Sequence, residues 1–198
     1  MKNFKLLALL WVVLIAGTLA WCWNNNANLG GNNGWDLIIE DNTPAYDAVI
    51  DYNDSLVDIA SQCIISESNI PTDYENGLDG IQAAINNTLT QCQNSIDQIN
   101  ALGDWEWDAS LREWIVKILE LDIAYFSKFS ELLPFLQKDE LTDEENTAYD
   151  NLFSEVENLD NELAQANENL IAIQEEFAKN HWFELESEDE EVVEEIAE

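Results

Sequence analysis

The residues of this chain that could take part in chemistry are few. Three cysteines and a single histidine, His181, stand among 41 aspartates and glutamates. With one histidine and no Cys-x-x-Cys pair, the sequence contains neither a nucleophile–base set nor a redox motif. Carboxylate pairs are so frequent that naming any two as acid and base would carry no information. We therefore predict no catalytic residues and a non-enzymatic protein.

Recognised metal and cofactor motifs are absent from the sequence as well. Carboxylate-bridged metal pairs in helical bundles use two Glu-x-x-His motifs, and one histidine cannot supply both. Glycine-rich phosphate loops and calcium-loop spacings are not found. We expect His181 to have a surface or packing role beside Trp182. We predict no cofactor-binding residues and no metal ligands.

Residues 1–23 have the pattern of an export segment. Lys2 and Lys5 precede an uncharged, largely apolar run that continues to Trp23. A cationic flank stays on the cytoplasmic side of a membrane while an acidic remainder passes outward. We therefore expect the body of the protein to lie outside the cytoplasm, in the cell envelope.

The end of this segment contains Cys22, the first of the three cysteines. Leu19–Cys22 resembles a bacterial lipobox, except that Trp21 stands where a small residue is expected. Acylation of Cys22 would leave an even number of cysteines outside the cytosol. Three outcomes remain open: cleavage after Ala20, lipidation of Cys22, or retention of the whole run as a membrane anchor.

Cys63 and Cys92 both lie on apolar helical stripes, and Gly77 lies midway between them in the sequence. If the chain continues past Cys63 as far as a turn at Gly77, the two sulfurs reach the same level and can form a disulfide. If the first helix stops near Ser66, they miss by on the order of 10 Å, which is too far for a disulfide. Both geometries are open, and the bond would be structural.

Four amphipathic stretches must position these residues. Apolar residues recur at steps of three and four, and from Tyr149 to Phe177 they form an unbroken heptad seam typical of a coiled coil. Thr142 and Glu145 form a capping-box motif ahead of this seam. Because such stripes need partners, we predict an all-α, antiparallel four-helix bundle. Its helices are expected near 44–66, 78–102, 105–137 and 142–180.

The remaining segments differ from the bundle in composition. An Asn- and Gly-rich stretch, 24–43, is expected to be a tether that leads to a bundle spanning 44–183. Residues 184–198 include nine acids and are expected to be a disordered tail. The formal net charge of −34 argues against nucleic acid and anionic lipid surfaces as partners. It favours cations or basic proteins.

Three parts of the chain, 46–53, 111–136 and the QEEFAKNHWFEL ending at 174–185, resemble exported helical-bundle lipoproteins of bacteria of the YiiG-like kind. The function of that family is unknown. The resemblance implies an all-helical extracytoplasmic domain, and it supplies no activity and no site residues.

These features together predict an interaction or structural module of the cell envelope. It would be attached to the membrane through its N-terminal segment and would bind another envelope protein, for which the charge favours a basic one. The alternative is an extracytoplasmic protein that binds a small molecule or a divalent cation. That alternative is motivated by the acidic charge and by the aromatic residues of the predicted third helix.

Overall fold

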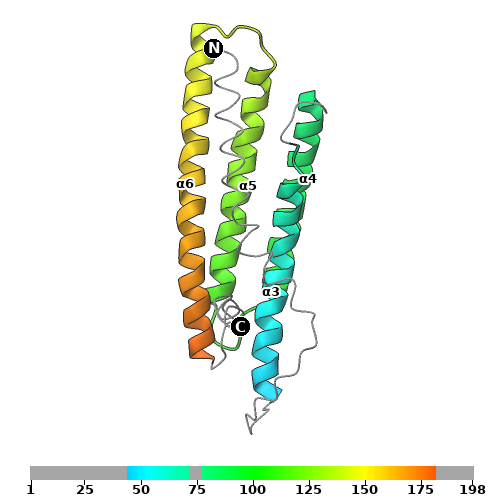
Figure 1. Ribbon diagram of the computed structural model, residues 1–198, viewed down its shortest axis with the longest axis vertical. Helices are drawn as coiled ribbons and strands as arrows, with labels where there is room; N and C mark the ends of the chain where they lie inside the picture. Colours follow the sequence, from blue (N-terminus) through cyan, green and yellow to red (C-terminus); the bar gives the residue numbers. More distant parts are fainter. Residues whose placement is uncertain (1–43, 72–76, 182–198) are drawn as a thin grey trace, which may run out of the picture.

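The computed structural model describes residues 44–71 and 77–181, and within them four α-helices follow one another. They are α3 (Pro44–Ser68), α4 (Gly77–Leu102), α5 (Ser110–Leu136) and α6 (Asp143–Asn180). Figure 1 shows these helices side by side along one long axis, which confirms the predicted all-α four-helix bundle. The predicted export segment, 1–23, the tether, 24–43, and the tail, 184–198, lie outside the described residues, as does Cys22.

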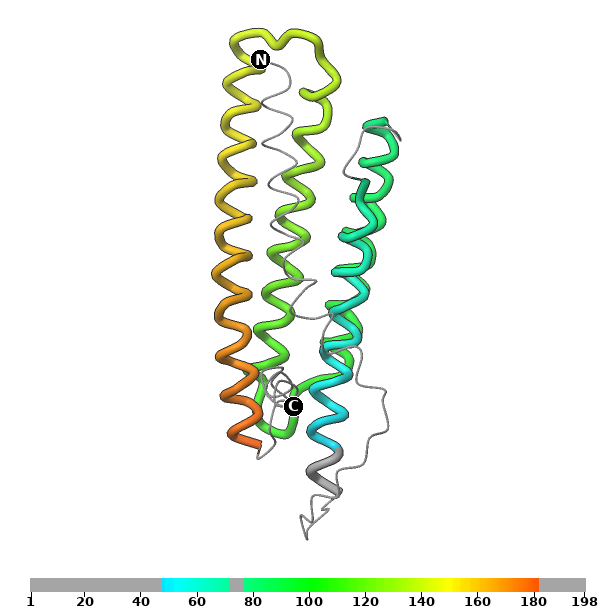
Figure 2. Tube along the Cα trace, in the orientation of Figure 1, coloured from blue at the N-terminus to red at the C-terminus, as the bar shows by residue number. Residues whose placement is uncertain are grey.

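Consecutive helices run antiparallel, because residue numbers rise on one helix as those of their partners fall on the next. The cross-helix contacts with this pattern are Ile59–Ser95 and Ser66–Thr88 between α3 and α4, Gln82–Ser130 and Asn100–Arg112 between α4 and α5, and Trp114–Ala166, Lys128–Glu155 and Phe135–Tyr149 between α5 and α6. The α5–α6 hairpin reaches beyond the end of α4, as the tube in Figure 2 shows.

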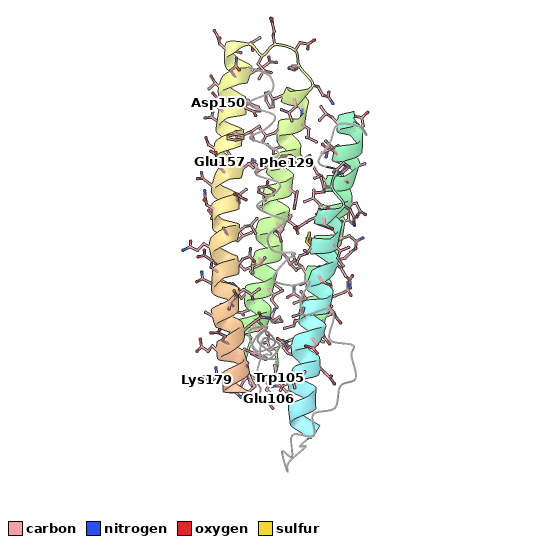
Figure 3. All side chains as sticks on the ribbon, viewed as in Figure 1. Trp105, Glu106, Phe129, Asp150, Glu157 and Lys179 are labelled. Carbon is pink, nitrogen blue, oxygen red and sulfur yellow. A yellow bond between two sulfur atoms is a disulfide. The ribbon has the colours of Figure 1, made fainter. Side chains whose placement is uncertain are left out.

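Helix α5 is the centre of the bundle, since it packs against α4, α6 and α3. Removing its apolar side chains from water stabilises the fold by roughly 25 cal/mol for each Å² buried. Figure 3 shows one of them, Phe129, between the helices. The residues that α5 buries are Leu111, Ile115, Ile118, Leu119, Asp122, Tyr125, Phe126, Phe129, Leu132 and Leu133. A single carboxylate, Asp122, therefore stands among nine uncharged side chains on this helix.

Helix α6 has the predicted narrow stripe. Its buried residues include Tyr149, Val156, Leu163, Leu170 and Phe177, spaced at seven residues, as a heptad seam requires. The opposite face is wet, and its acids include the exposed Asp150 and Glu157, which are labelled on α6 in Figure 3.

The predicted capping box at the start of α6 is present. Thr142 has extended backbone angles, its hydroxyl accepts a hydrogen bond from the Glu145 N–H at 3.2 Å, and the Glu145 carboxylate accepts one from the Thr142 N–H at 2.9 Å. Lys138 forms an ion pair with the same carboxylate. These bonds satisfy N–H groups that no helical carbonyl can reach, and they fix where α6 begins.

The third helix begins later than predicted, at Ser110 rather than near residue 105. Gly103 and Glu106 have φ angles of +80° and +51°, and the Asp108 N–H donates to the Trp105 carbonyl oxygen at 2.8 Å. Because these φ angles lie in the left-handed region, the backbone makes a tight turn here instead of a helix. Asp108 then accepts hydrogen bonds from the N–H and hydroxyl of Ser110 at 2.9 and 2.6 Å.

Among residues 44–71 and 77–181, no helix combines the necessary length with sufficient apolar character to cross a membrane.

The capping box gives a first prediction. Replacing Thr142 by alanine removes the acceptor for the Glu145 N–H, so we expect the free energy of unfolding to fall by about 1 kcal/mol. Thr147 is the matched control, because it lies on the same helix and its exposed hydroxyl donates only to the Asp143 carbonyl oxygen at 2.9 Å. Thr147→Ala should change stability by less than about 0.5 kcal/mol. Urea denaturation of both variants checks this, and equal effects would contradict the role of the cap.

Candidate functional site

The structure joins Cys63 of α3 and Cys92 of α4 in a disulfide, with their Cα atoms 4.5 Å apart. Both side chains are fully enclosed, at 0% exposure, between the two helices. Of the two geometries that the sequence left open, the structure therefore has the one with both sulfurs at the same level. Sequence reasoning had tied the other geometry to an early end of α3.

Helix α3 does end early, at Ser68, and the sulfurs still meet. Ser66 pairs with Thr88, which lies well inside α4, so α4 extends beyond the end of α3. Ile70 follows the helix and is only 5% exposed, which shows that the chain keeps packing on the bundle after α3 stops. The expectation that an early helix end separates the sulfurs is wrong, because a chain need not turn where its helix ends.

Two carboxyl groups lie near the disulfide. Cys63 Sγ and Glu67 Oε1 are 3.4 Å apart, and the ligand atoms of Cys63, Glu67 and Cys92 all lie within 4.8 Å of one another. Asp122 of α5 is 3% exposed and is close enough to Glu67 for its charge to act on that carboxyl group. Within the described residues, no hydrogen bond or ion pair reaches the Asp122 carboxylate.

Asp122 lines a small cavity between α3, α5 and α6. Ala60 and Ile64 of α3 line it on one side and Asn167 of α6 on another, with apolar residues of α5 between them. Its space suits roughly one water molecule. Ala60 and Ile64 share a helical face with Glu67 by their spacing, so the cavity and the disulfide belong to one region in the middle of the bundle.

Tyr125, one turn after Asp122 on α5, adds a further buried polar group. Its side chain is 1% exposed, and its hydroxyl has no hydrogen-bond partner within the described residues. Burial raises the pKa of this hydroxyl, and the charges of Asp160, Glu67 and Asp122 raise it further. Acidic groups of three helices, α3, α5 and α6, are thus close enough to act electrostatically on this buried hydroxyl.

Electrostatics in this region favour neutral carboxyl groups. Burial raises the pKa of Asp122 from 3.8 to about 7. Burial also raises the pKa of Glu67 well above its ordinary value, and the nearby charge of Asp122 raises it further. A carboxylate in a low-dielectric interior is costly, so burial shifts both groups toward the protonated form. A bound cation would offset the same cost.

A second polar cluster closes the end of the bundle around His181. Its Nε2 lies 3.1 Å from Asp108 Oδ2, and the two side chains are 8% and 9% exposed. The His181 ring also contacts Phe177, Trp105 and Trp107, with ring centroids 4.5 to 6.4 Å apart. His181 therefore has the packing role that the sequence predicted, and it does not stand at a frayed helix end.

Asp108 is the anchor of this second cluster. Its burial opposes ionisation, but hydrogen bonds from Ser110 and the interaction with His181 outweigh that effect and lower the pKa of Asp108. The carboxylate thus links the start of α5 to the residue that follows α6. Asp108 therefore joins the two chain segments, and Ser110 contacts Asp108 rather than His181.

Sequence reasoning missed Glu67 and Asp122. Asp122 falls four residues after Ile118 and four before Phe126, so it lies on the apolar stripe itself, a signal that was available. Glu67 falls four residues after Cys63, but the predicted helix ended at residue 66 and hid this spacing. Neither position alone shows that the two carboxyl groups lie close enough to interact electrostatically, because α3 and α5 are brought together only by packing.

Comparison of the chain with protein-family models, with curated proteins and with solved structures gives no match. What the chain does must therefore be inferred from its own residues.

The disulfide gives a second prediction. It closes a loop with a sequence separation of 29, and loop-closure entropy predicts that the double variant Cys63→Ala/Cys92→Ala loses about 3–4 kcal/mol of unfolding free energy. The measurement is urea denaturation of full chains that also carry Cys22→Ser, with and without a reductant. The double variant is its own control, since its stability should not respond to reductant. Equal stability of the oxidised and reduced parent chain would contradict a stabilising bond.

Asp122 gives a third prediction, on pH. Because its pKa is raised to about 7 in the folded chain, the stability that the proton confers is present below the unfolded value and is lost as pH rises through about 7. Between pH 5 and pH 8, the free energy of unfolding should fall by roughly 2–3 kcal/mol from this group. Asp122→Asn should remove that fall, because the amide cannot ionise.

Asp150 supplies the control for this pH experiment, since it is an aspartate exposed on α6. Asp150→Asn should leave the pH dependence as it is in the parent chain. Denaturation midpoints and slopes at several pH values measure the effect. The same pH dependence in the Asp122→Asn and parent chains would show that Asp122 is already ionised in the folded protein.

Proposed function

We propose that this protein is an exported, non-enzymatic helical bundle that acts as an interaction or structural module of the cell envelope. Its N-terminal segment, 1–23, would deliver it or hold it at the membrane, and the tether, 24–43, would connect that segment to the bundle. The observation that carries the proposal is the buried Cys63–Cys92 disulfide.

Disulfides of this kind form and persist where the surroundings are oxidising, as they are outside the cytoplasm. The bond lies between α3 and α4 and encloses the connection between them, so it holds the first hairpin together independently of any ligand. A bundle fastened in this way suits a place where chaperones and reducing systems are scarce. The pattern of Lys2 and Lys5 ahead of the apolar run supports the same location.

The surface of the bundle supports binding of a basic partner. Only five Lys and Arg residues lie in the described ranges, and four of them contact a carboxylate or an aromatic ring. Arg112 pairs with Asp104, Lys128 with Glu131 and Glu155, and Lys138 with Glu145, while Lys117 lies over the Trp114 ring. The exposed acids of α6 are left to attract cationic groups, so electrostatic steering would favour a basic protein.

The alternative function, divalent-cation binding, is favoured by a separate observation. Glu67 and Asp122 are close enough to act electrostatically on each other and on the Tyr125 hydroxyl, and that hydroxyl has no hydrogen-bond partner within the described residues. A divalent cation bound near these carboxyl groups would offset the cost of their negative charge in the interior.

The export proposal makes the fourth prediction. When the full chain is produced with a C-terminal tag in a bacterial host, we expect it in the envelope fraction, with the Cys63 and Cys92 peptides joined before reduction. Mass spectrometry of the N-terminus separates the three fates: a start at Trp21, a lipid on Cys22, or an intact first segment. Cys22→Ser is the matched variant, and it should change only the lipidated fate.

The opposite result of this experiment would be a cytosolic, unprocessed and reduced chain. A chain found in the cytosol with residues 1–23 intact and with free thiols at Cys63 and Cys92 would overturn the proposal. An envelope chain whose cysteines are joined would support it whichever N-terminal fate applies.

A further inference from the structure

Helix α3 does not accompany the rest of the bundle over its full length. It packs along α4 and contacts α5, but it does not pack along α6. It ends at Ser68, just after the Ser66–Thr88 contact, while α5 and α6 continue past that level (Figure 2). Because Gln82 of α4 pairs with Ser130 of α5, the register places the end of α5 roughly 15 Å beyond the end of α3. Among the described helices, none covers the side of α5 and α6 that faces α3 lower down.

The apolar face of α5 continues along this side. Asp122 lines the cavity beside Ala60 and Ile64 of α3, so its face of α5 points toward α3. Steps of seven residues keep to one face of a bundled helix, and from Asp122 they lead to Phe129 and Leu136. Leu136 is only partly buried. Helix α5 therefore presents apolar side chains where α3 has already ended.

Helix α6 presents a matching side. Asn167 lines the same cavity, and steps of seven lead from it to Asp160 and Phe153. Phe153 is only partly buried. We call the surface lined by Phe129 and Leu136 of α5 and Phe153 of α6 the open corner. Asp160 lies at its end nearest the cavity.

We propose that, in a chain that keeps its first segment, the apolar run 6–23 docks in the open corner as an additional helix. The bundle would then shield this run from water until a membrane accepts it. The proposal concerns one of the three N-terminal fates. It goes beyond the function proposed above, because it assigns the bundle a binding surface that requires neither a membrane nor a partner protein.

The length of the run fits the open corner. A helix of its 18 residues is about 27 Å long, and α6 rises about 26 Å between Asp143, where it begins, and Asp160. The 20 residues of 24–43 span up to roughly 60 Å when extended, whereas α3 from Pro44 to Ser68 is about 37 Å long. The tether is therefore long enough to bring the run from the start of α3 to the level of Asp160.

Charge favours one orientation of the docked run. Lys2 and Lys5 precede it and are the only basic residues ahead of α5. The far end of the open corner, where α5 connects to α6, carries the exposed acids Glu140, Asp143 and Glu144. Because opposite charges attract, the two lysines would lie at this end and Trp23 at the cavity end.

The Tyr125 hydroxyl is the independent observation at the cavity end. Its side chain is 1% exposed, it lies one turn after Asp122, and the hydroxyl has no hydrogen-bond partner within the described residues. Trp21 and Trp23 each carry an indole N–H, which donates and cannot accept. A buried hydroxyl without a partner lowers stability, so an indole N–H brought to this place would remove that cost.

Photo-cross-linking tests the proposal. The full chain is made by cell-free synthesis without membranes, under oxidising conditions, so that residues 1–23 stay attached. Phe153 is replaced by p-benzoylphenylalanine, whose benzophenone reacts with C–H groups that it contacts, and mass spectrometry identifies the joined peptides. We expect cross-links to residues 6–23 within a single chain. The matched control carries the same probe at Asn158, an exposed position on another face of α6, and should give no such cross-link.

Variants of the run make the test specific. Leu10→Asp should abolish the cross-link, because a charge in the run opposes its burial. Lys2→Glu/Lys5→Glu should lower the yield by about threefold, as expected for two exposed ion pairs. A second chain carries the probe at Leu136, which covers the case in which the probe at Phe153 disturbs the fold, and circular dichroism compares both chains with the parent.

Hydrogen exchange of the full chain without any probe supplies a further measurement. The amides of 6–23 should exchange more slowly in the parent chain than in Leu10→Asp. Equal exchange in these two chains, cross-links to 6–23 only between chains, or the same yield from Asn158 as from Phe153 would overturn the proposal. None of these measurements depends on where the protein is located, so this proposal and the export proposal can fail separately.

Discussion

The fold depends on the removal of the apolar face of α5 from water. This helix packs against all three of the others, and its large side chains Tyr125, Phe126 and Phe129 fill the space between them. Narrow stripes such as that of α6 cannot form a core alone, so they are stable only because α5 supplies the opposing surface. The Trp114 N–H, which donates to the Ala166 carbonyl oxygen at 2.9 Å, adds a directional bond to this contact.

In such an apolar interior, buried polar groups lower the stability of the fold. Asp122 lies on the central helix where an apolar residue would stabilise the bundle more, and the charge of Asp122 acts on Glu67 across the α3–α5 contact. The pKa values of both carboxyl groups are raised, as burial requires. Proteins retain such groups where a ligand, a proton or a specific register offsets the cost.

The outside of the bundle has few basic residues to neutralise its many acids. Most of the few basic residues are held locally, as Lys128 is by Glu131 and Glu155, so the remaining acids face solvent without neutralisation. Exposed pairs of this kind contribute little to stability. Their main consequence is a surface that repels copies of itself and attracts basic proteins or metal ions.

Periodicity and capping residues by themselves determined the four helices, their antiparallel order and the start of α6 at Thr142, because these depend on local spacing and local hydrogen bonds. They also placed Cys63 and Cys92 on inward faces. Only the tertiary structure decided that the sulfurs meet although α3 ends at Ser68, since the register of α3 on α4 is set by packing beyond the helix end. The same holds for Glu67 and Asp122, whose proximity depends on how closely α3 and α5 pack. The spacing of residues within either helix does not determine that distance.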